Sequence, residues 1–177
     1  MFLKIFPVCV RIEEQKRKAR DAEEEDGMRL IVCVEDRWGM AFNGRRLSMD
    51  EAVRERILEF TDGTPLWMSP YSERQFGDLP AGREICADEA FMDRAGQGEY
   101  CFAELCDPSG YREQLEEITL FRWNRRYPAD LYFDPALLDG FSLAASEEFP
   151  GTSHEKITME GYGRGGRFRR LAGGGWG

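Results

Sequence analysis

The apolar positions of the chain fall into short blocks separated by polar loops, and the first clear block is the run Leu30 to Val34. A short apolar run of this kind predicts a strand that is buried on both faces, as a central strand of a helix-covered sheet is. A glycine-containing loop, residues 35–47, follows the run. We therefore expect the sheet to be organised around this strand.

A helix is expected directly after the loop. The tetrapeptide Ser-Met-Asp-Glu at 48–51 has the form of a capping box, so the helix should begin at Ser48. Val53, Ile57 and Phe60 recur at spacings of four and three residues, which predicts one apolar face and one solvated face. Strand, loop and helix thus form the first unit of an α/β layer.

Strands and helices alternate along the next part of the chain. Short strands are expected at 66–68, 85–87 and 100–103, and helices at 70–76, at 88–96 and from Asp107 through Ile118. From Thr119 onward only strands are expected, at 119–124, 131–133, 141–144 and 157–162. This order predicts an α/β fold with three αβα layers, in which a mainly parallel sheet has an antiparallel carboxy-terminal edge. Right-handed crossovers would place helices on both faces.

The two ends of the chain differ in composition from the middle. Residues 11–26 are almost entirely charged and contain too few apolar positions to define a core face. Residues 163–177 combine glycines with four arginines and no acidic residue. We therefore predict a charged appendage at 1–27, one domain at 28–162 and a disordered Gly/Arg-rich tail at 163–177.

Composition limits the class of protein. The 177 residues suffice for one domain, and a net charge of −9 argues against the binding of polyanions by its body. Five cysteines without a CxxC pair predict no disulfide framework and fit a reducing cytosol. We expect no secretory signal, because Lys4 and Pro7 interrupt the apolar residues at 1–10, and no run of about 20 apolar residues is present. The prediction is an acidic cytoplasmic protein without a membrane partner.

Several motifs resemble dihydrofolate reductases. Asp36 follows the first strand, and Gly-Met-Ala-Phe-Asn-Gly-Arg-Arg-Leu at 39–47 resembles the family's loop Gly-Ile-Gly-x-Asn-x-x-Leu. Pro-Leu-Trp-Met at 65–68 resembles the family's next segment, and Ala-Asp-Leu-Tyr-Phe at 129–133 resembles its Gly-Asp-Thr-Tyr-Phe. The similarity covers about residues 28–162, and it implies a dihydrofolate reductase-like fold.

The chain departs from this family at the residues that carry its chemistry. In a gapless pairing Val53 stands where the family has the aspartate that protonates the pterin, and Asp50 lies close to a turn earlier. Ser-Pro-Tyr-Ser at 69–72 replaces the phosphate-binding Gly-Arg-x-Thr, and Glu104 stands near the family's Gly-Gly. A valine transfers no proton, and a carboxylate repels a phosphate. We therefore expect neither NADPH nor another cofactor.

The chain also resembles short bacterial proteins that have been carried under the name ribonuclease Z. The similar stretches are Arg-Trp-Asn-Arg-Arg-Tyr-Pro-Ala-Asp at 122–130 and Ser-His-Glu-Lys-Ile-Thr at 153–158. Ribonuclease Z is a two-zinc hydrolase that needs several histidines, whereas this chain has one, His154. The resemblance therefore does not imply a zinc-dependent ribonuclease.

Single residues offer few further candidates for catalysis or metal binding. His154 is either a hydrogen-bonded loop residue or a catalyst, and spacing alone pairs no serine or cysteine with it. Cys101 and Cys106 lack the additional ligands that zinc requires. We expect these two cysteines to be core thiols, and we expect no metal site.

Two basic segments are candidates for contact with nucleic acid. Arg122, Arg125 and Arg126 flank or follow Trp123, a combination that can neutralise phosphates and stack bases. The alternative is a strand on which Trp123 faces the core and Arg122 faces solvent. The arginine-rich tail resembles RGG segments that bind RNA, or it is a cloning or frameshift remnant.

The leading hypothesis is a binding protein on a scaffold that has lost the reductase chemistry. The binding cleft would be lined by Trp38, Met40, Phe42, Val53, Ile57 and Trp67. Its ligand would be an unknown small molecule or protein, with RNA as a further partner of the tail. The alternatives are an atypical NADPH-dependent reductase that uses Asp50, or an RNA-processing factor that uses His154 and the 122–126 cluster.

Overall fold

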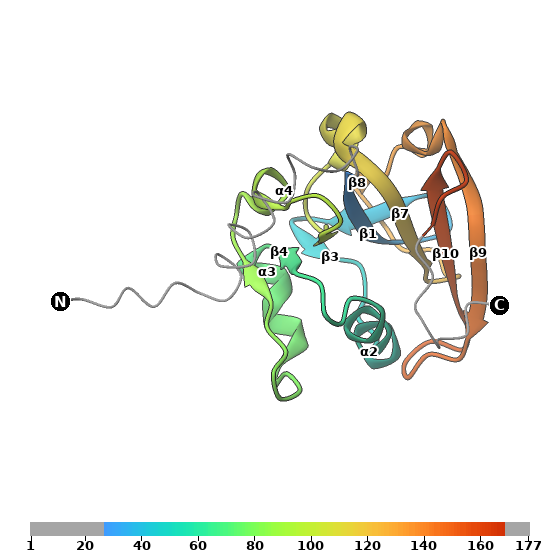
Figure 1. The fold of residues 1–177 in the computed structure, drawn as a ribbon. Helices are drawn as coiled ribbons and strands as arrows, with labels where there is room; N and C mark the ends of the chain where they lie inside the picture. Colours follow the sequence, from blue (N-terminus) through green and yellow to red (C-terminus); the bar gives the residue numbers. More distant parts are fainter. Residues whose placement is uncertain (1–26, 169–177) are drawn as a thin grey trace.

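The computed structural model describes residues 27–168 and contains a twisted seven-stranded sheet (Figure 1). Its strands are β1 (Met28–Val34), β4 (Leu66–Met68), β5 (Cys86–Ala87), β6 (Tyr100–Phe102), β7 (Leu115–Arg122), β9 (Phe141–Phe149) and β10 (Ile157–Arg164). Their order is β5-β4-β6-β1-β7-β10-β9. The first five strands of this order are parallel, and β10 runs antiparallel to both β7 and β9. The predicted parallel sheet with an antiparallel edge is confirmed.

The run that was expected to be central is the middle strand of the sheet. β1 lies between β6 and β7, and the side chains of Leu30, Val32 and Val34 are fully buried in one apolar cluster. Ile31 is fully buried in a second cluster on the opposite face. A strand buried on both faces needs apolar residues at every position, which is why the sequence shows a continuous apolar run rather than alternation.

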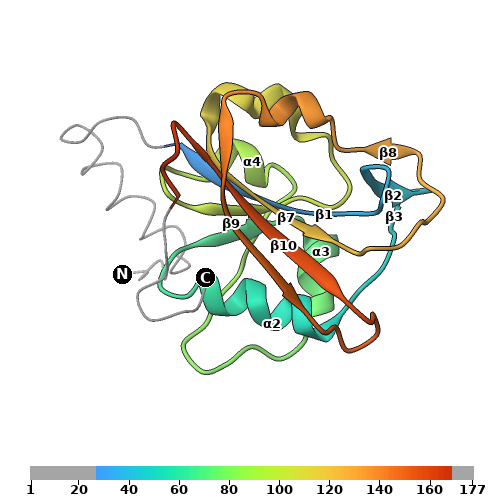
Figure 2. The same ribbon diagram turned by 90° about the vertical axis from the view of Figure 1, so that its right-hand side faces the viewer.

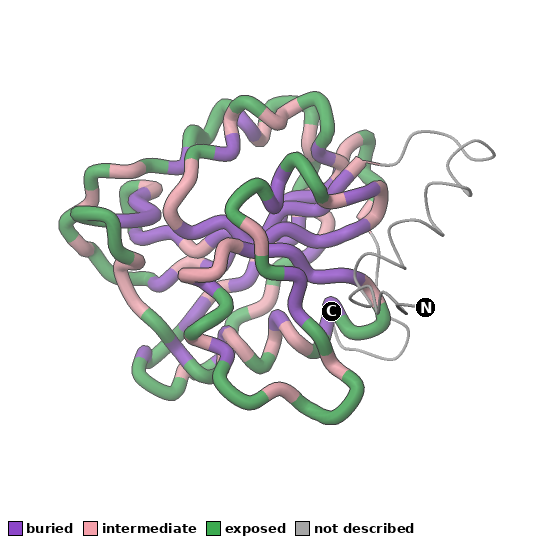
Figure 3. Tube along the Cα trace, turned by 90° about the vertical axis from the view of Figure 1, so that its left-hand side faces the viewer, coloured by how far each residue is buried: buried purple, intermediate pink, exposed green. Residues whose placement is uncertain are grey.

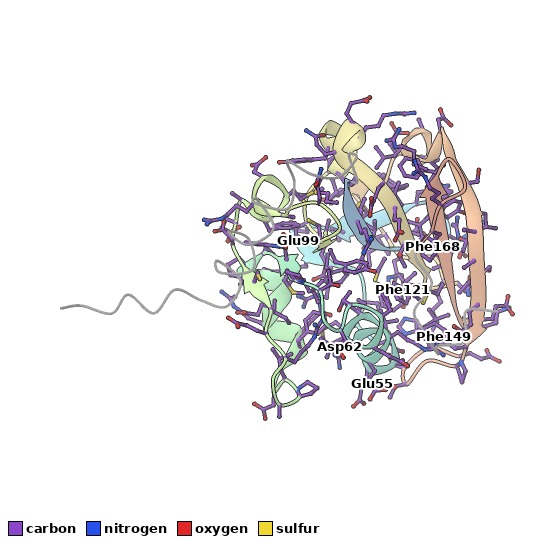
Figure 4. All side chains as sticks on the ribbon, viewed as in Figure 1. Glu55, Asp62, Glu99, Phe121, Phe149 and Phe168 are labelled. Atoms are coloured by element: carbon purple, nitrogen blue, oxygen red, sulfur yellow. The ribbon has the colours of Figure 1, made fainter. Side chains whose placement is uncertain are left out.

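Helix α2 (Glu51–Phe60) covers one face of the sheet together with α3 (Pro70–Glu73) and the 3₁₀ turn η1 (Arg74–Phe76), as Figures 1 and 2 show. Val53, Ile57 and Phe60 are the buried face of α2, as their spacing predicted. In Figure 4 the labelled rings of Phe121 and Phe149 lie beside α2, and their centroids are 6.4 Å apart. This face therefore has an aromatic core between helix and sheet.

The other face carries α4 (Phe91–Arg94) and the 3₁₀ turns η2 (Pro108–Gln114) and η3 (Pro135–Leu138). Phe91, Met92 and Leu137 from these turns pack into the same cluster as Leu30 and Val32. Elements on both faces complete the predicted three-layer arrangement, and Figure 3 shows the strands buried between more exposed outer segments.

A second, smaller sheet follows β1. It consists of β2 (Gly39–Phe42), β3 (Arg45–Arg46) and β8 (Leu131–Tyr132), in the order β3-β2-β8. The segment 35–47, which was expected to be a loop, is thus largely a hairpin, and residues 131–132 pair with it rather than with the main sheet. Backbone pairing over such short strands leaves no periodic signal in the sequence.

The predicted start of α2 and the predicted helix at 107–118 are wrong. The side chain of Asp50, not of Ser48, caps α2, because its Oδ1 accepts a hydrogen bond from the Ala52 amide at 2.9 Å. The helix expected from Asp107 through Ile118 is a 3₁₀ turn that ends at Gln114. Leu115 and Ile118 belong to β7, where they pair with β1 opposite Met28 and Leu30. Tertiary pairing with the central strand overrides the local helical spacing.

The last strand extends past the domain boundary that was expected at Tyr162. β10 continues to Arg164, whose guanidinium donates to the carbonyl oxygens of Leu115 at 3.0 Å and Arg112 at 2.7 Å. The chain then turns back, so that a Cβ placed on Gly161 would lie 2.4 Å from Cζ of Phe168. Residues 163–168 are therefore part of the folded domain, whereas the predictions for 1–26 and 169–177 lie outside the described residues. Among residues 27–168, no helix has the length and apolar character needed to cross a bilayer.

Candidate functional site

The parallel strands β1, β4, β6 and β7 all end at one edge of the main sheet, which we call the carboxyl edge. In open α/β sheets ligands bind outside this edge, because the chain segments that leave neighbouring strands diverge there. The segments that leave these strands carry Glu35, Ser69, Glu104 and Trp123. Any site of this fold class is therefore expected among these segments, the start of α2 and the β9–β10 connection at 150–156.

Asp50 and His154 meet at this edge although they are 104 positions apart in the sequence. Asp50 comes from the start of α2 and His154 from the β9–β10 connection. The distance from His154 Nδ1 to Asp50 Oδ2 is 2.9 Å, and the two side chains are 2% and 0% exposed. From the sequence these two residues are candidates for two different enzymes, and the structure brings them into one site.

Asp50 binds the β9–β10 connection as well as its own helix. Its two oxygens accept hydrogen bonds from the backbone amides of Thr152 and Ser153 at 2.9 Å, in addition to that of Ala52. These amides and His154 hold the pKa of Asp50 far below its usual range even though burial alone would raise it. Asp50 is therefore an ionised anchor at neutral pH.

Gly151 is required for this close approach of the connection to α2. A Cβ at Gly151 would lie 2.6 Å from Oδ2 of Asp50 and 2.7 Å from the carbonyl oxygen of His154. Both distances are shorter than a carbon atom tolerates. The Pro-Gly pair at 150–151, which the sequence identifies only as a turn, therefore also determines how near His154 comes to Asp50.

The second nitrogen of His154 faces two hydroxyl groups. Nε2 lies 3.1 Å from Oγ of Ser48 and 3.1 Å from the phenolic oxygen of Tyr127. The imidazole stacks on the indole ring of Trp123, with centroids 4.6 Å apart and an interplanar angle of 23°. Since Asp50 accepts from Nδ1–H, Nε2 is the acceptor for these hydroxyls in the neutral imidazole.

Sequence reasoning missed Ser48 and Tyr127 as members of this site. Ser48 was assigned to helix capping, a role that Asp50 takes, and its side chain turns to His154 instead. Tyr127 occurs in the sequence only as a member of the stretch 122–130, with no role at a site assigned to it. No spacing rule links residues 48, 127 and 154, so only the assembled fold could identify the cluster.

A second polar cluster lies between the small sheet and the end of β6. The buried carboxylate of Glu104 accepts from Nε of Arg46 at 3.0 Å and from Nε2 of Gln75 at 2.7 Å. The Arg46 guanidinium also lies over the ring of Tyr71, 4.3 Å from its centroid. Burial raises the pKa of Glu104, and the contacts with Arg46 and Gln75 only partly oppose that shift.

The residues expected to line one cleft are distributed over both faces of the sheet. Met40, Trp67 and the partly buried Trp38 belong to the cluster that includes Leu30, whereas Val53 and Ile57 belong to the cluster beneath α2. The Phe42 side chain is 48% exposed at the end of β2. Trp38 and Phe42 are the members of this group with accessible surface at the carboxyl edge, and the role of the group in binding stays a prediction.

The basic segment after β7 is divided between core and surface. Trp123 is buried, as the alternation along the strand predicted, so its ring is not available for stacking on a base. Arg122 forms an ion pair with Glu160 and lies over the ring of Trp38, 4.3 Å from its centroid. Arg125 and Arg126 are exposed, and anion binding by these two residues stays a prediction.

The cysteines considered as zinc ligands are free thiols in this part of the chain. Cys101 is fully buried and Cys106 is partly buried against the same cluster. Burial raises the pKa of both thiols, which opposes the thiolate that a metal needs. Within residues 27–168, no group of three or more histidine, cysteine, aspartate or glutamate side chains is placed to hold a metal ion.

Comparison with solved structures identifies the fold. A dihydrofolate reductase from Enterococcus faecalis complexed with NADP(H) and RAB-propyl superimposes with a TM-score of 0.58 at 9% sequence identity, over 79% of this chain and 97% of that one. The fold is dihydrofolate reductase-like. No protein-family model matches the sequence, and no curated protein matches it. The resemblance to proteins named ribonuclease Z receives no support from any of these comparisons.

Within the dihydrofolate reductase-like fold, the two polar clusters occupy the carboxyl edge. Val53, the residue paired by sequence with the family's catalytic aspartate, is 3% exposed and packs in the core beneath α2. Glu104, near the position of the family's Gly-Gly, is buried beside Arg46. The buried polar residues that the structure places at this edge therefore include Asp50, His154 and Glu104.

Proposed function

We propose that this protein is a cytosolic small-molecule-binding protein that uses the carboxyl edge of a dihydrofolate reductase-like scaffold and does not reduce dihydrofolate with NADPH. The observation that carries the proposal is the state of Asp50, the nearest carboxylate to the lost catalytic position. It is fully buried, ionised and hydrogen-bonded by Ala52, Thr152, Ser153 and His154. A carboxylate in this state has no proton to deliver and no free lone pair with which to orient a pterin.

The residues at the expected phosphate position also disfavour NADPH. Glu104 is held at the end of β6 by Arg46, whose guanidinium is engaged with this carboxylate and with the Tyr71 carbonyl oxygen at 3.2 Å. A pyrophosphate placed there would face a carboxylate instead of free backbone amides. The residues present do not fit the family's nicotinamide cofactor.

The ligand surface that we propose centres on Trp38. This residue is partly exposed, packs on Phe133 with ring centroids 5.8 Å apart and is covered on one side by Arg122. An indole ring with accessible surface suits a planar small molecule, because the ring supplies apolar area for stacking. Such a ligand would reach the carboxyl edge without the reductase residues.

Two binding measurements test the proposal. Tryptophan fluorescence of the purified protein is titrated with NADPH, and equilibrium dialysis against a cytosolic metabolite extract is followed by mass spectrometry of the retained compounds. We expect no saturable change with NADPH, and retention of a metabolite that is weakened in Trp38→Phe. A control variant, Tyr111→Phe, alters an aromatic residue on η2, outside the proposed surface, and should retain the metabolite normally. Saturable NADPH quenching together with NADPH-dependent reduction of dihydrofolate would overturn the proposal.

A further inference from the structure

The side chains of Ser48, His154 and Asp50 form a continuous hydroxyl–imidazole–carboxylate chain at the carboxyl edge. Oγ of Ser48 lies 3.1 Å from Nε2 of His154, and Nδ1 of His154 lies 2.9 Å from Oδ2 of Asp50. A base within hydrogen-bond reach of a nucleophile, with a third group orienting the base, is the arrangement that activates serine for acyl transfer. From this geometry we propose that Ser48 is an activated nucleophile toward small activated esters.

The environment of each member suits its role. The ionised Asp50 fixes the tautomer in which Nδ1 carries the proton, which leaves the lone pair of Nε2 for the serine hydroxyl. Trp123 stacks on the imidazole at 4.6 Å and restricts rotation of the ring. The base is therefore positioned by three elements: α2, the β9–β10 connection and the end of β7.

Ser48 is accessible whereas its base is not. Its side chain is half-buried, next to the exposed Met49 and two residues before the cap of α2, while His154 is 4% exposed. The partly exposed residue of the pair is thus Ser48, whereas the imidazole is buried.

The proposed reaction has two balanced steps. Oγ of Ser48 forms a bond to the carbonyl carbon of the ester, its proton passes to Nε2 of His154, and the bond from that carbon to the leaving oxygen breaks as the alcohol departs with that proton. Water then attacks the acyl-serine, gives a proton to Nε2, and the acyl–Oγ bond breaks. The carboxylic acid is released and Ser48 regains its proton. This chemistry needs water and no other co-reactant.

Tyr127 is a competing donor to the same nitrogen. Its hydroxyl is also 3.1 Å from Nε2, so it shares the lone pair that Ser48 needs. Removal of this hydroxyl in Tyr127→Phe should leave Ser48 as the donor to Nε2 and should increase the rate at which Ser48 is labelled. A purely structural histidine would not show this dependence.

The test uses p-nitrophenyl acetate as substrate and a fluorophosphonate as covalent probe, with the full chain. We expect stoichiometric labelling, with peptide mass spectrometry placing the phosphonyl group on Ser48. In Ser48→Ala both labelling at this position and esterase turnover should be lost, and in His154→Gln the labelling rate should fall about a hundredfold or more. The matched control Ser142→Ala, at an exposed serine on β9, should label as the wild type does.

Other outcomes would overturn the proposal. Ser48 is not activated if the wild-type chain is labelled only at other residues, or if turnover persists in Ser48→Ala. Neither observation depends on whether His154→Gln folds. The inference shares the carboxyl edge with the proposed function but uses no bound metabolite. Failure of metabolite retention with normal Ser48 labelling would reject only the binding proposal, and retention without labelling would reject only the nucleophile.

Discussion

Two carboxylates, those of Asp50 and Glu104, are buried at the carboxyl edge, and their pKa values are shifted in opposite directions. Asp50 receives backbone amides whose positions are fixed by a helix start and a loop, and its pKa is lowered. Glu104 receives the long side chains of Arg46 and Gln75, and its pKa is raised because desolvation outweighs them. Amides that the fold already holds in place solvate an anion without a further loss of side-chain entropy. Burial by itself therefore does not determine the charge state of a carboxylate.

Of the substitutions that probe this difference, loss of the Asp50 side chain should lower the stability of the fold most. Asp50→Ala leaves three backbone amides and His154 without their acceptor, and we expect a loss of about 3–5 kcal/mol in the free energy of unfolding. The measurement is urea unfolding followed by circular dichroism. The control is Asp134→Ala, since Asp134 caps η3 through a bond of the same length, 2.9 Å, but is exposed. That variant should lose only about 1 kcal/mol, and equal losses in both would contradict the special role of Asp50.

A methyl group at Gly151 should separate the connection from α2. Gly151→Ala places a carbon 2.6 Å from Asp50 Oδ2, which forces the β9–β10 connection outward, and we expect a loss of about 1–3 kcal/mol. Thermal unfolding by calorimetry measures the change. Gly110→Ala is the matched control because a Cβ there would meet nothing within 4 Å. Unchanged stability of Gly151→Ala would mean that the connection is not held against Asp50.

The pH dependence of stability should have two components of opposite sign. Below about pH 4 the unfolded chain binds the Asp50 proton more readily than the folded chain does, so stability falls as the pH decreases. The folded chain keeps the Glu104 proton to a higher pH than the unfolded chain does, because burial raises the pKa of Glu104. Stability therefore falls as the pH increases from about 4 through the pKa of Glu104 in the folded chain. Each component changes stability by at most about 1.4 kcal/mol per pH unit.

Two single variants separate these components in urea unfolding measured across pH 2–8. Asp50→Asn should lose the decrease in stability on the acidic side, and Glu104→Gln should lose the decrease that accompanies rising pH. Gln75→Ala, which removes one partner and leaves both carboxylates, should retain both components. A profile of Glu104→Gln that parallels the wild type above pH 4 would show that Glu104 titrates normally.

The smallest effect is expected at the periphery of the Asp50 cluster. Tyr127→Phe removes one hydroxyl that faces Nε2 of His154 while Ser48 remains, and we expect a loss of about 0.5–1 kcal/mol by chemical unfolding. Tyr132→Phe, whose hydroxyl donates to the Ala129 carbonyl oxygen on the exposed surface, serves as the control and should change stability less. A loss for Tyr127→Phe as large as that for Asp50→Ala would show that Tyr127, and not Asp50, anchors His154.

Local sequence determined the elements whose cause is local. The continuous apolar run at 30–34 predicted the central strand, and the spacing of Val53, Ile57 and Phe60 predicted the buried face of α2. Each of these signals depends on residues within one or two turns of each other. The layered α/β class and its antiparallel edge followed from the order of these elements.

Tertiary structure alone decided where the same local signals fail and where the site lies. Leu115 and Ile118 have helical spacing but pair with β1, because burial against the central strand is worth more than one turn of helix. Ser48 has a capping sequence but faces His154, because Asp50 already binds the first-turn amide. Asp50 and His154 are 104 residues apart, and only the packing of the β9–β10 connection against α2 brings them within 2.9 Å. Periodicity reports a residue's own element and face, whereas a site is made by contacts between elements.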